Sequence, residues 1–375
     1  MPAADSFTLK TARTSATFGY GPAGAIVEIA DPLPESYWAH PANAWSQLMA
    51  SRIPGLENIW LKYEGSHLSG SFKDRIMAAS LGELLARQPD CPGIVVPSSG
   101  NAAISAAALC ARRGLPMVAI VPTTVPIERL RPVTSRGAIL IRAGEGPSQS
   151  YALADRLSEA LGFFKLYSTF ASPWAEWGCR AIGRELAGQM TQPIARILAP
   201  VSAGPVLIGT ANGLAEAGLP LPQLVAVQAA GCAPIARAFA LGHDDVAPWD
   251  DSVETKAAAI ADRLAGYPQD GTRVLNAVRA SNGSAEAVTD LELASARAAL
   301  LKYDGLDAEF SACAAIALLM REPHLATPGT VAIITASGFK HTYAGDAPTP
   351  SPDLAILDTL KTILATLAPE ASIGA

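Results

Sequence analysis

The chain has 375 residues, a length that suits one large domain or two ordinary ones. Hydrophobic residues make up 50% and charged residues 17%, so the chain can bury a sizeable core. Its formal net charge of −6 argues against nucleic acid as the main partner. We expect neither a secretory signal nor a membrane span, because no apolar run is long enough and free of charge. Five widely spaced cysteines without a C-x-x-C pair indicate reduced thiols in a cytoplasmic protein.

The first segment of the chain reads as an irregular arm. Residues 1–45 are rich in Pro, Gly, Ser and Thr and contain one apolar run at 25–27, which predicts at most one strand. Trp38 and Trp45 are expected to pack this arm onto the body of the protein. From residue 59 onward, strand patterns alternate with helical patterns, and this alternation predicts a parallel sheet with helices on both faces.

The elements expected from residue 59 onward follow in chain order. The predicted strands are 59–64, 94–97, 117–121, 138–141, 197–199, 224–228 and 331–335. The predicted helices are 76–86, 102–111, 127–136, 150–161, 176–188, 206–217, 291–301, 311–320 and 354–367. Pro132 should break or kink its helix, and Gly114 and Gly218 should cap the ends of theirs. The polar stretch 243–270 suggests an exposed excursion, and the proline-rich stretch 345–352 a stiff linker before the last helix.

One lysine lies in a turn between a predicted strand and a predicted helix, at residues 69–75. This turn reads Ser-Gly-Ser-Phe-Lys-Asp-Arg, so small residues precede an aromatic, then Lys73, then the helix. The positive end of a helix disfavours the cationic form of a lysine, which suits Lys73 to act as an amine nucleophile toward an aldehyde. The alternative is a surface lysine that pairs with Asp74.

Three further loops of small residues follow predicted parallel strands, at the edge where open α/β sheets bind ligands. Residues 98–101, Ser-Ser-Gly-Asn, offer donors for a carboxylate or a phenolic oxygen, or form an ordinary helix cap. Residues 202–204, Ser-Ala-Gly, form a possible phosphate cradle, although Pro205 removes one donor from it. Thr335 or Ser337 is placed to bond a heterocycle nitrogen, or simply ends a strand.

Several other chemistries have no support in the sequence. The five histidines show no metal-ligand spacing, so no metal site is expected. No G-x-S-x-G, Walker loop or G-x-G-x-x-G is present, which weakens hydrolase, nucleotide-triphosphatase and nicotinamide interpretations.

The four loops and their order resemble those of the fold-type II pyridoxal-phosphate enzymes, and within these the threonine synthases. Residues 69–75 resemble the family's small-residue turn before a phenylalanine, the Schiff-base lysine and Asp-Arg. Residues 99–101 match its Ser-Gly-Asn, and residues 200–206 fall without gaps on its glycine-rich phosphate loop. Residues 335–340 resemble its Thr-Gly-His-Gly-Leu-Lys. The resemblance spans about residues 57–341, with lesser matches at 62–64, 176–180, 259–268 and 309–312.

The resemblance implies that Lys73 is the catalytic residue and carries pyridoxal 5'-phosphate. The asparagine of the family contacts the cofactor's 3-hydroxyl group, and its threonine meets the pyridine nitrogen. The cofactor-binding residues would be Phe72, Lys73, Asn101, Val201, Ser202, Ala203, Gly204, Val206 and Thr335. The residues that bind the substrate, by holding the carboxylate of the substrate, would be Ser98, Ser99, Gly100, Asn101 and Ala102.

The resemblance also implies a fold like that of the tryptophan synthase β chain, an α/β fold with two open twisted parallel-sheet domains and helices on both faces. Residues 1–75 and 172–345 would form the larger, cofactor-binding domain, and residues 76–171 the smaller, mobile one. Residues 346–375 would form the linker and C-terminal helix. A homodimer is expected on the same basis.

Three departures from the family pattern leave the cofactor in place but keep the activity open. The early Gly-x-Thr-Pro-Leu is absent, with 43–48 in about its place; the phosphate loop has fewer glycines and gains Pro205; and Ser337 replaces a histidine. Three interpretations of the function remain. The first is a threonine synthase-like activity, which converts phosphohomoserine to threonine and phosphate. The substrate anion would then meet one of three arginines, Arg75, Arg129 or Arg180.

The second activity is β-elimination or β-replacement on a serine- or cysteine-like amino acid, as in an ammonia-lyase or a cysteate synthase-like enzyme. The Ser337 and Pro205 substitutions favour this second activity. The third interpretation is a non-catalytic binding protein that kept the fold. The presence of Lys73 and Asn101 counts against it.

Overall fold

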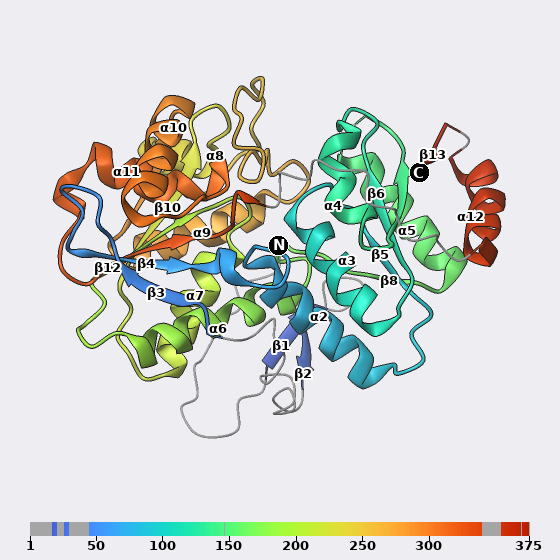
Figure 1. Ribbon diagram of the computed structural model, residues 1–375, viewed down its shortest axis with the longest axis horizontal. Helices are drawn as coiled ribbons and strands as arrows, with labels where there is room; N and C mark the ends of the chain where they lie inside the picture. Colours follow the sequence, from blue (N-terminus) through green and yellow to red (C-terminus); the bar gives the residue numbers. More distant parts are fainter. Residues whose placement is uncertain are drawn as a thin grey trace.

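A computed structural model of the chain describes residues 17–20, 26–29, 45–145, 147–339, 354–368 and 370–374. Two sheets form two lobes that lie at opposite ends of the longest axis (Figure 1). No helix in the described part of the chain is both long and apolar enough to cross a membrane.

The larger sheet has six strands. Their order is β11 (Ser284–Val288), β10 (Gln223–Ala229), β9 (Arg196–Pro200), β12 (Thr330–Ile334), β4 (Ile59–Tyr63) and β3 (Gln47–Ala50). All neighbouring pairs are parallel except β3 and β4. The carboxyl ends of the parallel strands therefore lie at one edge, as a ligand site of this fold class requires.

The smaller sheet has five strands. Their order is β13 (Ser372–Gly374), β7 (Ile139–Arg142), β6 (Met117–Val121), β5 (Ile94–Val96) and β8 (Phe164–Lys165). Only β13, at the edge, is antiparallel to its neighbour. The expected pair of parallel sheets with helices on both faces is thus confirmed, with one antiparallel edge strand added to each.

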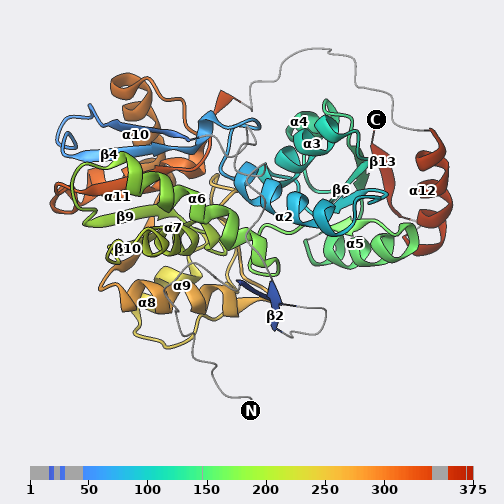
Figure 2. The same ribbon diagram turned by 90° about the horizontal axis from the view of Figure 1, so that it is seen from below.

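Helices cover both faces of each sheet (Figure 2). They are α2 (Lys73–Arg87), α3 (Asn101–Arg113), α4 (Arg131–Thr134), α5 (Pro147–Leu161), α6 (Pro173–Gln189), α7 (Pro205–Glu216), α8 (Pro234–Ala240), α9 (Pro268–Ala280), α10 (Asp290–Ala299), α11 (Ala314–Arg321) and α12 (Leu354–Leu367). In the larger lobe, the core formed with α6, α7 and α9 is separated by the sheet from the core formed with α10 and α11. Helix α2 packs on both α6 and α3 and so joins the two lobes.

Strand β6 lies at the centre of the smaller sheet and is apolar along its whole length. A strand that is covered by helices on both faces of the sheet needs an apolar residue at every position. In β6 all five residues are buried. Met117 and Val121 contribute to the core beneath α3, whereas Val118 and Ile120 contribute to the core with α5 and α12. Alternate residues therefore point to opposite faces, as the strand period of two dictates.

The helix boundaries differ from the sequence prediction in informative places. Helix α2 begins at Lys73, three residues earlier than expected, so the lysine is the first helical residue. The expected helix 127–136 is a 3-10 turn, Ile127–Leu130, followed by the short α4. Pro132 lies at the start of α4, where a missing N–H costs nothing, so it opens a helix and does not break one. Gly114 ends α3 in the left-handed conformation, as expected.

Several short elements were not predicted. The strands β3, β8, β11 and β13 and the helices α8 and α9 lie in stretches without a clear apolar period. The expected exposed excursion 243–270 contains no strand and ends in the first turn of α9.

The N-terminal part of the chain adds a pair of strands, and the C-terminal part adds one helix and one strand. Strands β1 (Thr17–Tyr20) and β2 (Ile26–Ile29) pair with each other, so the arm holds two strands where one was expected. Trp45 is 63% exposed and faces Gly188 of α6, while Trp38 lies outside the described residues. Helix α12 has the predicted bounds and packs on α5, and β13 extends the smaller sheet. The expected linker 345–352 also lies outside the described residues.

Candidate active site

The turn that carries Lys73 is hydrogen-bonded to the loop that follows β12. Phe72 N–H donates to the Thr335 carbonyl at 3.0 Å, and Ser337 N–H donates to the Gly70 carbonyl at 2.8 Å. Two loops separated by more than half of the chain therefore form one rigid junction. The hydroxyl of Thr335, a residue only 6% exposed, makes no hydrogen bond to the described residues and is available to a ligand.

The Lys73 amine lies in a partly buried position. Its Nζ is 3.5 Å from the Ser168 carbonyl and 4.6 Å from the centre of the Phe72 ring. Burial lowers the pKa of Lys73 to about 8, although Cys179, Asp262 and Glu309 act in the opposite direction. An amine with this pKa is unprotonated in a useful fraction at neutral pH, as a nucleophile or a base must be.

Asp74 does not pair with Lys73, so the alternative of a surface ion pair is not what the structure shows. Its Oδ2 accepts from Ser69 N–H at 2.6 Å, and its Oδ1 accepts from the Ser105 hydroxyl at 2.5 Å. Ser105 belongs to α3, so Asp74 braces the lysine turn and connects it to the smaller lobe.

The lowered pKa of Lys73 predicts an unusual pH profile for chemical labelling. In the cofactor-free protein, the rate at which trinitrobenzenesulfonate labels Lys73 should rise with pH and level off above about pH 8. An ordinary lysine keeps gaining reactivity up to about pH 10.5, because only the unprotonated amine reacts. Peptide mass spectrometry of samples labelled at a series of pH values measures the profile. A rate that still climbs above about pH 9.5 would contradict the buried amine.

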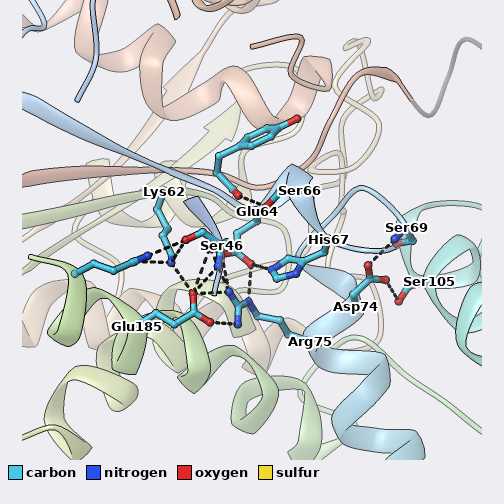
Figure 3. Close-up of polar contacts among 12 residues, drawn as sticks. Ser46, Lys62, Glu64, Ser66, His67, Ser69, Asp74, Arg75, Ser105 and Glu185 are labelled. Carbon is cyan, nitrogen blue, oxygen red and sulfur yellow. Dashed lines mark hydrogen bonds and ion pairs between the residues drawn. The ribbon is translucent and has the colours of Figure 1, made fainter. Parts of the chain in front are cut away.

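Charged side chains are buried together behind the lysine turn (Figure 3). The fully buried Arg75 donates to Glu64 through Nε and Nη2 at 2.6 and 3.0 Å, and to Glu185 through Nη1 and Nη2 at 2.6 and 2.9 Å. Lys62 Nζ donates to Glu185 Oε2 at 2.6 Å. We call these four residues the buried charge network. Two cations face two carboxylates, so burial leaves no net charge uncompensated.

The buried charge network fixes the start of α2. Glu64 directly follows β4, Arg75 lies in the first turn of α2, and Glu185 lies on α6. Burial by itself would raise the pKa of Glu64, but Arg75 and His67 outweigh it and hold that pKa well below its usual range. The ion pair of Glu64 and Arg75 therefore holds the first turn of α2, with Lys73, against the sheet, and the bonds from Arg75 to Glu185 hold it against α6.

The predicted phosphate loop is a turn rich in unused N–H groups at the start of α7. No described residue accepts a hydrogen bond from the backbone N–H groups of Ser202, Ala203, Gly204 and Val206. Pro205 is the first residue of α7 and has no N–H, so the gap predicted in the cradle is present. Unpaired N–H groups at a helix N-terminus bind anions. This loop therefore suits a phosphate group.

Gly204 is the residue of the loop that tolerates least change. Its φ of 101° is one that side-chain-bearing residues rarely adopt, and an added Cβ would lie 2.1 Å from Val274 Cγ2. Gly204→Ala should therefore lower stability by about 2 kcal/mol and weaken pyridoxal phosphate binding at least about tenfold. Urea unfolding and fluorescence titration with pyridoxal phosphate measure the two effects.

Gly218→Ala is the matched control for Gly204→Ala. Gly218 also has a positive φ, 78°, but nothing lies within 4 Å of an added Cβ. It follows the end of α7, at the opposite end from the loop. The control should lose some stability and keep its affinity for the cofactor. Equal affinity losses in both variants would remove the phosphate assignment from residues 202–206.

The loop 98–101 ends in the first residue of α3. The N–H groups of Ser99, Asn101 and Ala102 likewise meet no acceptor among the described residues. The Asn101 amide donates through Nδ2 to Glu309 Oε2 at 2.9 Å. Gly100 is the N-cap of α3 and its N–H bonds the Ser98 hydroxyl at 3.3 Å. A helix start with free N–H groups suits a carboxylate, in agreement with the predicted substrate site.

The structure adds residues that the sequence did not single out. Ser168 faces the lysine, and Phe170 lies 3.8 Å from where a Cβ on Gly204 would be. Asp262 accepts from the Tyr267 hydroxyl at 3.0 Å, and burial raises its pKa. Burial also raises the pKa of Asp270 to about 6. Asp262 lies in the stretch 259–268 that the resemblance already covers. Ser168, Phe170 and Asp270 lie on loops or at a helix start without any pattern of their own, so only the fold identifies them.

Two of the three candidate arginines are already engaged. Arg75 belongs to the buried charge network, and Arg180 pairs with Glu176 at 3.0 Å and Glu216 at 2.6 Å. Arg129 is exposed near the end of its 3-10 turn. In the part of the chain that the structure describes, no group of three or more His, Cys, Asp or Glu side chains could hold a metal ion.

The donor set fits pyridoxal phosphate. The N–H groups of residues 202–206 can donate to a phosphate, and the Lys73 amine can react with an aldehyde. The Asn101 amide can donate to a phenolic oxygen. The Thr335 hydroxyl is left for a pyridine nitrogen. Each polar group of the cofactor thus has a complementary group on one of the four loops.

Comparison with known proteins agrees with this donor set. The family profile described as "Pyridoxal-phosphate dependent enzyme" matches residues 45–337. A threonine synthase of Methanosarcina acetivorans is 29% identical over 280 residues, which are 73% of this chain and 67% of that protein. A serine dehydratase-like protein of Mus musculus is 27% identical over 209 residues, 56% of this chain and 62% of that one. The structure of maize serine racemase superposes with a TM-score of 0.69 at 19% identity, covering 88% of this chain and 96% of the racemase.

Proposed function

This chain belongs to the family of pyridoxal-phosphate-dependent enzymes, and we propose that it is a lyase of the threonine synthase type. Its substrate would be O-phospho-L-homoserine, which with water yields threonine and inorganic phosphate. The observation that carries the proposal is the position of Lys73. Lys73 is the first residue of a helix, and the pKa of its amine is about 8. The turn that precedes it is hydrogen-bonded to the loop that contains Thr335.

Each loop has one task in this reaction. The N–H groups of Ser202, Ala203, Gly204 and Val206 would hold the cofactor phosphate, and those of Ser99, Asn101 and Ala102 would hold the substrate carboxylate. Lys73 would hold the cofactor; its amine, freed when the substrate amine takes its place, would take a proton from the substrate and return it as general base and acid. Pyridoxal phosphate, when bound, supplies an electron sink for the charge that develops at the substrate α-carbon. The Thr335 hydroxyl, a neutral partner, would orient the ring without forcing its nitrogen to be protonated.

A second candidate is elimination or replacement at the β-carbon of a serine-like amino acid. Arg75 and Arg180 are engaged by carboxylates, which leaves neither free to meet a substrate phosphate. The carboxyl groups that raise the pKa of Lys73 belong to Asp262 and Glu309, whereas burial raises the pKa of the Cys179 thiol and keeps it neutral. Such surroundings suit a hydroxyl leaving group better than an anionic one, and the similarity to a serine dehydratase-like protein supports the same candidate.

Product analysis with the cofactor-loaded protein separates the two candidates. Phosphate and threonine should appear in equal amounts from O-phospho-L-homoserine, with no release of ammonia. Ammonia and a 2-oxo acid from L-serine or L-threonine, with no turnover of phosphohomoserine, would overturn the first candidate in favour of the second. Absence of both reactions in a protein that binds the cofactor would favour a non-catalytic role.

We further propose a larger cofactor domain of residues 1–75 and 172–345, and a smaller mobile domain of residues 76–171. The separate sheets of the two lobes support this division. We also propose a homodimer in the cytoplasm. All five cysteines are buried, unpaired thiols, which suits a reducing compartment. Analytical ultracentrifugation of the cofactor-loaded protein tests the dimer, and a single species with the mass of one chain would exclude it.

A further inference from the structure

The side chains of Asn101 and Glu309 form a hydrogen bond between the two lobes at the candidate site. Asn101 is the first residue of α3, in the smaller lobe, and Glu309 precedes the 3-10 turn Phe310–Cys313 of the larger lobe. Asn101 Nδ2 donates to Glu309 Oε2 at 2.9 Å, across a sequence separation of 208 residues. Asn101 is neutral, so the contact does not compensate the charge of Glu309, and the two residues are not neighbours in the sequence. We therefore consider a functional reason for the contact.

Glu309 is held in place by its own backbone. Its N–H donates to the Ala336 carbonyl at 2.9 Å, and its carbonyl accepts from Ala312 N–H at 2.8 Å. Ala336 in turn forms a bridge with Ser71, two residues before Lys73. The backbone of Glu309 is therefore hydrogen-bonded to the same junction of loops that positions Lys73.

A carboxylate restricts the amide of Asn101 to one of its two orientations. An asparagine amide carries two N–H donors on nitrogen and one acceptor oxygen, and the two ends exchange when the group rotates by half a turn. An ionised carboxylate only accepts hydrogen bonds, so it selects the orientation with Nδ2 toward Glu309. The second N–H of that nitrogen then remains as a donor.

Resting on the proposed function, we infer that Glu309 is a positioning residue that orients the Asn101 amide so that an N–H faces the cofactor's phenolic oxygen. With Glu309 absent, rotation would present Oδ1 to that oxygen, and two acceptors would repel each other. The inference assigns Glu309 no contact with the reacting atoms. It predicts an effect on cofactor binding that passes entirely through Asn101.

Isosteric variants of Glu309 test the inference by fluorescence titration with pyridoxal phosphate. Glu309→Gln offers a carbonyl oxygen in the same place and should bind the cofactor within about threefold of the unchanged protein. Glu309→Met has a similar length and no comparable acceptor, and should bind at least about tenfold more weakly. Equal affinities of the Met variant and the unchanged protein, or equal losses for Gln and Met, would overturn the inference.

A double-mutant cycle shows whether the effect passes through Asn101. Asn101→Ala should weaken binding about as much as Glu309→Met, and the double variant should lose little more than either one. Additive losses would overturn the positioning role. If Glu309→Met does not fold, as judged by circular dichroism, Glu309→Ala replaces it in the same cycle. Failure of the unchanged protein to bind pyridoxal phosphate would refute the proposed function itself. That result differs from one in which the unchanged protein and the Glu309 variants all bind the cofactor with the same affinity.

Discussion

Replacing Lys73 with alanine is expected to lower turnover by at least about a thousandfold, because the variant loses its proton-transferring amine and its link to the cofactor. The side chain reaches a partly buried position beside the Ser168 carbonyl, and a water molecule cannot take over its covalent role. The steady-state rate with the substrate identified in the product analysis measures the loss.

Lys302→Ala is the matched control for Lys73→Ala. Lys302 is exposed and lies in the π-helical turn Leu300–Asp304, outside the four loops. The control should keep its rate within about twofold, since an isolated surface change rarely alters more than local solvation. Turnover by Lys73→Ala at more than about a tenth of the unchanged rate would remove Lys73 from the chemistry.

Replacing Arg75 with methionine is expected to destabilise the cofactor-free protein by about 3–5 kcal/mol. The change leaves Glu64 and Glu185 buried with Lys62 as the remaining cation of the network, and an uncompensated buried charge is costly. Methionine fills a similar volume, so the loss reports charge and hydrogen bonding more than packing. Urea unfolding followed by circular dichroism measures it.

Arg87→Met is the control on the same helix. Arg87 pairs with Glu83 one turn away, and its side chain is 54% exposed. A surface pair of this kind contributes at most a few tenths of a kcal/mol, so the control should leave the urea midpoint almost unchanged. Similar destabilisation by both variants would contradict the special role given to burial.

The buried charge network also predicts how stability depends on acid. The pKa of Glu64 is lower in the folded state than its usual value near 4.5. A carboxylate of this kind contributes stability that is complete above its unfolded pKa and is lost as the pH falls through its folded pKa. Urea midpoints should therefore decline below about pH 4.5, and they should decline less in Glu64→Gln.

The fold was predictable where the chain carries a clear period. Strand β6 is apolar at every position because helices cover both of its faces, and its bounds agree with the prediction. Helix α12 repeats leucine and isoleucine at helical spacing and has the predicted bounds. Strands β3 and β13 were missed because each lies at a sheet edge and contains no fully buried residue. Strand β8 has only two residues, too few for any period.

The positions of the four loops at one sheet edge were predictable from the sequence, and the contacts between them were not. Small residues after a parallel strand mark a ligand edge, and this rule identifies the loops that contain Lys73, Asn101, Gly204 and Thr335. The partners of these residues come from distant segments. Asn101 and Glu309 are 208 positions apart, and Arg75 and Glu185 are 110 positions apart. No local pattern encodes such pairs, because the topology of the sheets brings them together.

Mapping the lysine that carries the cofactor tests the central claim most directly. The protein is incubated with pyridoxal phosphate, reduced with borohydride so that the attachment becomes permanent, digested, and analysed by peptide mass spectrometry. We predict one modified peptide, which contains Lys73, with labelling lost in Lys73→Ala and kept in Lys302→Ala. Modification of another lysine in place of Lys73, or of none, would contradict the claim that the site is built around Lys73.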